Sequence, residues 1–208
     1  MRDYRDTNPK LGQHLLAGLI AVVAFAMLFG YFSRAKADTK YNWTGMYIGG
    51  SVGSSSGVGN GFGVDGHSFG ATAGGGLQMG SIYLGAFIDY DHKALDFAGN
   101  AFDVQEITAG GRGGILVTNA TMIYGLIGHV WLDVKDMNFK TTGLALGGGM
   151  ETRLSEHLSF AIEYRQNTFE DLPNGTEHVA KAILKWNIPA SMYQSLDAPV
   201  KGAKKLAP

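Results

Sequence analysis

A stretch of regular alternation near the end of the chain, Leu158–Gln166 (LSFAIEYRQ), constrains the fold more than any other segment. Through Arg165 its even-numbered positions are apolar or aromatic, and its odd-numbered positions are small, polar or charged. Because side chains alternate between the two faces of a β-strand, this pattern predicts a strand with one apolar and one polar face. Such a strand fits a soluble β-sandwich with the apolar face inward, or a membrane β-barrel with that face towards lipid.

The composition favours the membrane alternative. Charged residues make up 17% of the chain, against about 25% in a typical soluble domain. Glycine occurs 31 times in 208 residues, about twice its usual ~7% frequency. The net charge of −1 gives no basic field that would indicate a nucleic-acid partner. The chain has no cysteine, which excludes disulfides, thiolate zinc sites and a cysteine nucleophile.

The period-two pattern continues over residues 42–188 and predicts an all-β domain. We expect eight strands, at 42–53, 67–79, 82–91, 103–115, 122–134, 143–154, 158–166 and 179–188. The connections near residues 80, 118 and 156 are short, and four longer loops are expected at 54–66, 92–102, 135–142 and 167–177. Short turns that alternate with longer loops are typical of an antiparallel up-and-down transmembrane barrel, with both termini on the turn side.

Glycines and balanced charges share the polar faces of these strands. The narrow interior of an eight-stranded barrel is filled by side chains, which explains strand glycines better than a soluble surface does. We therefore expect a lumenal network of ion pairs that closes the lumen, formed by Asp89, Glu106, Arg112, Glu151, Glu163, Arg165, Lys181 and Lys185. Loss of one partner would leave a buried charge unpaired, at a cost of about 3–5 kcal/mol. A secreted soluble sandwich is the alternative that alternation alone does not exclude.

Two sets of polar residues have the chemistry of a site, and both have a simpler interpretation. His157, Ser159 and Glu163 are the residue types of a hydrolytic triad, as in a lipid-modifying outer-membrane enzyme. However, His157 lies in a predicted periplasmic turn, away from any outer-leaflet substrate. His129 and Asp133 are expected on the lumenal face of one strand, but two ligands do not make a metal site. The sequence therefore predicts no catalytic residue, no metal site and no cofactor.

The first 37 residues have a different character from the rest. Leu15–Phe32 is an apolar run, and the small residues Ala35 and Ala37 follow it. A basic start, an apolar centre and an A-x-A ending are typical of a secretory signal peptide, here cleaved after Ala37. The run also reaches the lower length limit of a transmembrane helix, so a retained inner-membrane anchor is the alternative. The expected organisation is a signal peptide or helix at 1–37, a linker at 38–41, a barrel at 42–188 and a polar tail at 189–208.

Several short motifs resemble one family of membrane proteins. The segment WTGMYIGG at 43–50 is similar to a motif of the small alphaproteobacterial outer-membrane β-barrels of the opacity, or outer-membrane-protein-A-like, family. GGRGG at 110–114, YGLIG at 124–128 and IEYR at 162–165 look like further family positions. The resemblance implies an eight-stranded barrel in the lipid of the outer membrane, inserted by the barrel-assembly machinery. It also implies a structural or surface role without catalysis.

A second resemblance concerns the N-terminus. Thr7, Asn8, Pro9 and Lys10, ahead of the apolar run, look like the start of PufX and of the similar helices called protein W. PufX is the single-helix subunit that interrupts light-harvesting rings around purple-bacterial reaction centres. The resemblance covers residues 1–34 and implies an alternative function. In it the chain is an accessory subunit, anchored in the inner membrane, whose helix contacts a photosynthetic core complex through those four residues.

Overall fold

The computed structural model describes residues 41–59, 62–97, 100–135, 139–170 and 175–189. The predicted signal peptide or helix at 1–37, and with it Thr7, Asn8, Pro9 and Lys10, lies outside the described residues. So does the predicted tail from residue 190 onward. Within the described ranges, no helix is long and apolar enough to cross a membrane.

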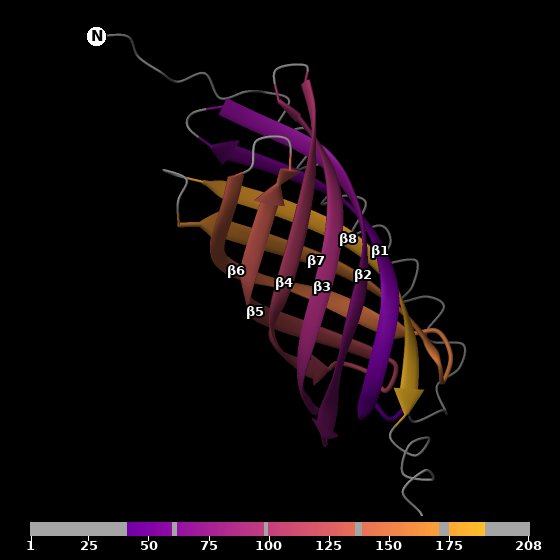
Figure 1. The fold of residues 1–208 in the computed structure, drawn as a ribbon. Helices are drawn as coiled ribbons and strands as arrows, with labels where there is room; N and C mark the ends of the chain where they lie inside the picture. Colours follow the sequence, from indigo (N-terminus) through magenta and orange to yellow (C-terminus); the bar gives the residue numbers. More distant parts are fainter. Residues whose placement is uncertain (1–40, 60–61, 98–99, 136–138, 171–174, 190–208) are drawn as a thin grey trace, which may run out of the picture. The chain divides into compact units, whose positions relative to one another are not determined.

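Eight antiparallel strands form a closed barrel in sequence order (Figure 1). The strands are β1 (Gly45–Gly59), β2 (Phe62–Met79), β3 (Ile82–Phe97), β4 (Asn100–Leu116), β5 (Thr121–Val134), β6 (Phe139–Arg153), β7 (Leu158–Phe169) and β8 (Thr176–Pro189). Each strand pairs with its neighbours in the chain, and β1 pairs with β8 to close the sheet. Closure removes the unpaired edges that an open sheet presents to other chains. The predicted eight-stranded up-and-down barrel is confirmed.

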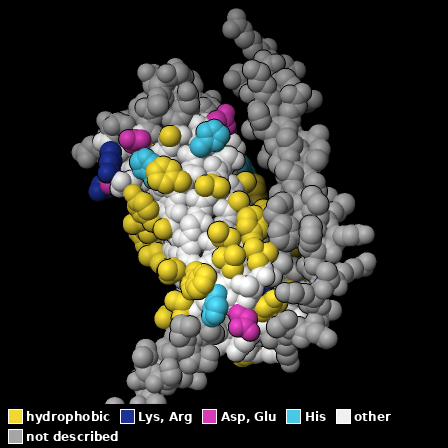
Figure 2. Space-filling model, turned by 90° about the vertical axis from the view of Figure 1, so that its right-hand side faces the viewer, with side chains coloured by type: hydrophobic (Ala, Val, Ile, Leu, Met, Phe, Trp, Pro, Cys, Tyr) yellow, Lys and Arg dark blue, Asp and Glu magenta, His cyan; other side chains and the backbone are white. Residues whose placement is uncertain are grey.

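The apolar faces of the strands point outward. All eight strands carry large exposed hydrophobic side chains, and Ile48 on β1 and Trp186 on β8 are 56% and 53% exposed. Figure 2 shows hydrophobic side chains over the middle of one face, with histidine and charged side chains nearer its two ends. Soluble monomers rarely expose apolar patches beyond a few hundred Å². The closed barrel and its apolar exterior therefore overturn the soluble-sandwich alternative.

Strand β5 corrects one predicted face. His129 was expected in the lumen, but it lies on the outer surface with its ring centroid 4.5 Å from that of Trp131. The lumenal positions of β5 hold Tyr124 and other bulky apolar side chains instead. Tyr124 pairs in register with Gly149 on β6, where an added Cβ would come within 2.7 Å of the tyrosine hydroxyl. A lumenal glycine thus makes room for the aromatic ring, and this fixes which face of β5 turns inward.

The connections opposite the short turns are shorter than predicted. β1 continues to Gly59 and β2 begins at Phe62, so most of the expected loop at 54–66 is a paired hairpin. The predicted loops at 92–102, 135–142 and 167–177 also shrink, because the adjoining strands extend into them. Glycine and serine have low strand propensity, but a neighbouring strand that offers backbone partners continues the ladder through them. We call this end of the barrel the loop end.

The other end of the barrel, which we call the turn end, holds the β2–β3, β4–β5 and β6–β7 connections. The first residues of β1 and the last residues of β8 also lie there. At the β2–β3 turn, Gly80 has a φ of 63°, in the left-handed region that glycine adopts without steric cost. At the β4–β5 turn, the hydroxyl of Thr118 accepts hydrogen bonds from the backbone N–H groups of Ala120 and Thr121. The short turns predicted near residues 80, 118 and 156 are confirmed.

Candidate functional site: the charged lumen

Charged side chains fill the lumen in equal numbers of each sign. Among the described residues, six cationic and six carboxylate side chains are buried. They are Lys93, Arg112, Arg153, Arg165, Lys181 and Lys185, with Asp89, Asp91, Glu106, Glu151, Glu163 and Glu177. All eight residues expected in the lumen are in this set. Their ion pairs fall into three clusters along the barrel.

The turn-end cluster consists of Arg112 on β4, Glu151 on β6 and Lys185 on β8. Arg112 Nη1 donates to Glu151 Oε2 at 2.9 Å, and Lys185 Nζ donates to the same oxygen at 2.8 Å. The second carboxylate oxygen of Glu151 accepts a hydrogen bond from the Ser159 hydroxyl at 2.7 Å. Charge-assisted hydrogen bonds from three strands therefore converge on one carboxylate.

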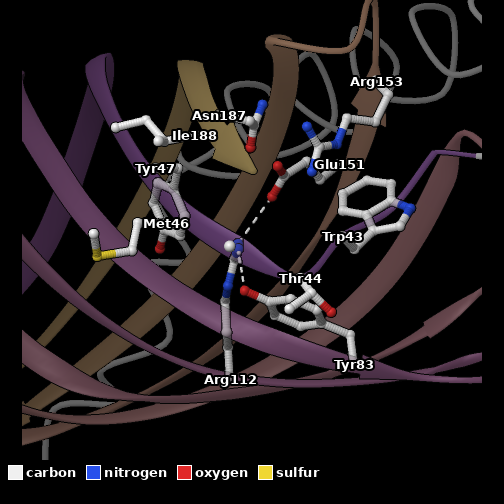
Figure 3. A pocket seen from close by; sticks show the side chains of 11 residues that line it. Trp43, Thr44, Met46, Tyr47, Tyr83, Arg112, Glu151, Arg153, Asn187 and Ile188 are labelled. Carbon is white, nitrogen blue, oxygen red and sulfur yellow. Dashed lines mark hydrogen bonds and ion pairs between the residues drawn. The ribbon is translucent and has the colours of Figure 1, made fainter. Parts of the chain in front are cut away.

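Aromatic rings surround the turn-end cluster. The guanidinium of Arg112 lies 4.5 Å from the ring centroid of Tyr47 and 4.9 Å from that of Tyr83, and it donates to the Tyr83 hydroxyl at 3.1 Å (Figure 3). At the mouth of the turn end, the guanidinium of Arg153 lies 4.8 Å from the ring centroid of Trp43. Desolvated cation–π contacts of this kind are attractive, so the rings stabilise the cations as well as filling space.

The middle cluster consists of Asp89 and Asp91 on β3, Glu163 and Arg165 on β7, and Lys181 on β8. Arg165 Nη2 donates to Asp89 Oδ2 at 2.6 Å and to Glu163 Oε1 at 3.1 Å. Lys181 donates to Asp91 and lies 3.6 Å from Asp89. Since β3 and β7 are four strands apart in a ring of eight, the Arg165–Asp89 pair crosses the lumen.

The loop-end cluster consists of Lys93 on β3, Glu106 on β4, Asn167 on β7 and Glu177 on β8. Lys93 Nζ lies 2.6 Å from Glu106 Oε2 and 2.6 Å from Glu177 Oε1. Asn167 Nδ2 donates to Glu106 Oε2 at 3.2 Å and to Glu177 Oε2 at 2.9 Å. A hydrophobic cluster belongs to the same half of the barrel, formed by Val104, Val130, Leu132, Val134 and Phe169.

Sequence reasoning missed four of the buried charges. Lys93 and Glu177 fell in the predicted loops at 92–102 and 167–177, which are strand at these positions. The alternation of strand positions could have identified them, because Lys93 continues the lumenal face of Asp89 and Asp91. Asp91 ends the expected strand at 82–91 and has the parity of Asp89, but it was not counted in the network. Arg153 lies in the expected strand at 143–154 and has the parity of Glu151, but it was not counted either.

The three residues with the chemistry of a triad, His157, Ser159 and Glu163, do not assemble into one. The Ser159 hydroxyl is engaged with Glu151 and accepts a hydrogen bond from Asn187 Nδ2 at 3.0 Å. The ring of His157 stacks on Trp186 with centroids 5.3 Å apart, and its Nδ1 lies 3.3 Å from the Asn187 carbonyl oxygen. Among the described residues, no hydrogen bond joins His157 to Ser159 or to Glu163.

The geometry also gives no support to a metal site at His129 and Asp133. His129 lies on the outer surface, and Asp133 forms an ion pair with Lys140 at 3.1 Å. Over the described ranges, no three or more histidine, cysteine or acidic residues are grouped so that they could hold a metal ion.

A family model described as the outer membrane protein beta-barrel domain matches residues 21–184 of the chain. The match spans well over half of the sequence. The chain belongs to this family. Membership agrees with the closed barrel and its apolar exterior, and it supports an outer-membrane location. It gives no support to an alphaproteobacterial origin, to the PufX-like interpretation of residues 1–34 or to an inner-membrane location.

Solved barrels share the fold at low sequence identity. Neisserial surface protein A is 13% identical, with a TM-score of 0.53 over 70% of this chain and 98% of that one. Ail, the attachment invasion locus protein of Yersinia pestis, is 12% identical, with a TM-score of 0.51 over 70% of this chain and 99% of its own. Identities this low show the fold alone. The comparison with curated proteins finds no match.

Proposed function

We propose that this family member is a non-enzymatic outer-membrane barrel with a closed lumen, which serves the envelope as a structural element and displays its loop-end hairpins. The observation that carries the proposal is the set of ion pairs that join non-neighbouring strands through the lumen at three levels. A lumen filled by paired and hydrogen-bonded charges does not conduct as an open aqueous path would. A permeating ion would have to displace one partner of each ion pair.

Contacts at the turn end support closure there. Trp43 Nε1 donates to the carbonyl oxygen of Asn119 at 3.5 Å, which holds the indole against the β4–β5 turn. Arg153 donates through Nη1 to the carbonyl oxygen of Glu156 at 3.0 Å and through Nη2 to that of Asn42 at 3.2 Å. Trp43 and Arg153, which stack on each other, thus bridge several segments around the mouth.

The environment of Ser159 argues against a lipid-modifying enzyme. Its hydroxyl is buried and donates to Glu151, so it has no histidine base and no path to a lipid on the outer surface. A nucleophilic serine needs a base within hydrogen-bond reach and an accessible substrate position. Neither condition is met by the arrangement of His157 and Ser159.

Planar-bilayer recording of the purified barrel tests the proposal. We expect no large, steady conductance from the native protein, because the three clusters occupy the lumen. Replacement of both Trp43 and Arg153 by alanine is expected to increase brief openings, whereas alanine at the exposed Lys140 is the matched control and is expected to have no effect. A large and steady conductance of the native barrel would contradict the closed-lumen proposal.

Lipid analysis tests the non-enzymatic part separately. Lipid A from cells that produce the native chain, Ser159→Ala or His157→Ala is expected to give identical mass spectra. A modified lipid species that is present with the native chain and disappears with Ser159→Ala would show that the barrel is an enzyme.

A further inference from the structure

The loop-end cluster holds two carboxylates for one cation. Glu106 and Glu177 both form their ion pair with Lys93. The cations that balance the lumen as a whole lie at the turn end, where they surround Glu151 and have no ion pair with the loop-end cluster. If both glutamates were ionised, the loop-end cluster would therefore carry one uncompensated negative charge.

The two glutamates share both of their nitrogen donors. Lys93 Nζ lies 2.6 Å from an oxygen of each carboxyl group, and Asn167 Nδ2 donates to Glu106 Oε2 at 3.2 Å and to Glu177 Oε2 at 2.9 Å. Lys93 and Glu106 are 0% exposed and Glu177 is 7% exposed. The two carboxyl groups are thus neighbours in a part of the lumen that solvent does not screen.

The carboxyl groups of Glu106 and Glu177 also form a hydrogen bond with each other. An ionised carboxylate only accepts hydrogen bonds, so one of the two groups must carry a proton that it donates to the other. Two ionised carboxylates in contact would instead repel each other, and adjacent carboxyl groups in such sites share one proton for this reason.

The surrounding strands do not supply a further cation for this pair. The other charged side chains that act on Glu106 include Arg165 on β7 and Lys181 on β8, and Asp91 on β3 is its partner in register. Both cations already form ion pairs with the carboxylates of the middle cluster, and Asp91 adds negative charge. Strands β1 and β5 place uncharged residues beside the two glutamates.

We propose that Glu106 and Glu177 together bind one proton at neutral pH. The loop-end cluster then consists of one ammonium, one carboxylate and one neutral carboxyl group, and its charges balance. A metal ion does not fit as the alternative, because Lys93 Nζ occupies the position between the two carboxyl groups. This site goes beyond the proposed structural function and does not depend on whether the lumen conducts.

Infrared spectra of the full chain, folded in lipid vesicles in H2O or in D2O at neutral pH, test for the proton directly. A protonated carboxyl group absorbs apart from ionised carboxylates, and its band shifts when deuterium replaces the proton. We expect this band in the native protein, which needs no variant. Its absence overturns the proposal.

Three variants locate the proton within the lumen. Glu106→Gln and Glu177→Gln are each expected to lose the protonated-carboxyl band, because the remaining glutamate is then ionised opposite Lys93. Glu156→Gln removes an exposed carboxyl group at the turn end and is expected to keep the band. A band that persists in both of the loop-end variants would place the proton elsewhere and overturn the proposal.

Isoelectric focusing of the folded chain in a non-ionic detergent counts the charge of the pair. Glu156→Gln is expected to raise the isoelectric point, because it removes a negative charge. Glu106→Gln is expected to leave the isoelectric point unchanged, since the pair carries one negative charge before and after the substitution. In urea, where the chain is unfolded, both variants are expected to shift equally. An equal rise for both in the folded state would show that Glu106 and Glu177 are both ionised and overturns the proposal.

Discussion

The guanidinium of Arg165 on β7 lies 2.6 Å from the carboxylate of Asp89 on β3, a strand on the opposite side of the lumen. Backbone hydrogen bonds join each strand only to its two neighbours, so they do not hold opposite walls together. Side chains that meet in the lumen supply this connection. The barrel is thus stabilised in two ways, by the closed ladder around its wall and by ion pairs across its interior.

Loss of one partner of this pair is expected to destabilise the barrel strongly. Arg165→Gln leaves Asp89 and Glu163 without their shared cation, and we expect the free energy of unfolding to fall by about 3–5 kcal/mol. The double variant with Asp89→Asn is expected to lose less than the sum of the two single losses, with a coupling energy of ~1–3 kcal/mol. Urea unfolding in lipid vesicles measures all three values.

The control for that cycle is an exposed ion pair. Lys140 pairs with Asp133 on the surface, and Lys140→Gln is expected to change the stability by less than about 1 kcal/mol. Strict additivity of Arg165→Gln and Asp89→Asn would contradict a direct interaction across the lumen.

Substitution of glycine by alanine is expected to affect stability differently on the lumenal face and on the outer face of the barrel wall. At Gly74 an added Cβ would lie 2.4 Å from the Tyr47 hydroxyl oxygen and 2.5 Å from the backbone oxygen of Ala86, which cannot move aside. Gly74→Ala is therefore expected to destabilise the barrel by about 1–3 kcal/mol through overpacking. At Gly125 on the outer surface the nearest neighbour would be a carbonyl oxygen at 3.8 Å.

Gly125→Ala is thus the matched control, with an expected effect between zero and a gain of about 1 kcal/mol because it restricts the unfolded chain. The same urea unfolding experiment compares the two variants. Equal destabilisation by both substitutions would show that the lumenal glycines are not required for packing.

The backbone amides of the β1–β2 hairpin at the loop end are expected to be protected from hydrogen exchange. Residues 54–57 of β1 pair with β2 on one side and with β8 on the other, although a sequence of serines and glycine predicted a loop. Hydrogen–deuterium exchange of the folded barrel is expected to be slower at these amides than at Asn119 in the β4–β5 turn. Exchange as fast as that of Asn119 would favour the original loop prediction.

Period-two alternation predicted eight strands, and together with the composition and the alternating connection lengths it predicted a barrel with outward apolar faces, correctly for the strands other than β5. The prediction failed where glycine and serine content was taken as evidence for a loop although the alternation of the strand continued. The glycine- and serine-rich segment at 54–66 was assigned to a loop, although the neighbouring strands continue its ladder. Lys93 and Glu177 were lost from the charge network through the same error.

The contacts within the lumen could not be predicted from the pattern of one strand. Parity places Arg165 and Asp89 inside, but their pairing depends on the register of eight strands and on the closure of the ring. The lumenal position predicted for His129 was wrong for a related reason. The inward face of β5 is fixed by the space that Gly149 leaves for Tyr124, which is a property of two strands together.

The three tryptophans test the orientation of the wall towards lipid. Trp131 on β5 and Trp186 on β8 are 44% and 53% exposed on the outer surface, whereas Trp43 is 3% exposed at the mouth of the turn end. In variants that keep one tryptophan and carry phenylalanine at the other two positions, brominated acyl chains are expected to quench the fluorescence of Trp131 and Trp186. Trp43 is expected to be quenched much less, because the wall separates it from lipid. Quenching of Trp43 as strong as that of Trp186, or an unquenched Trp131, would show that the wall, or β5 within it, faces the other way.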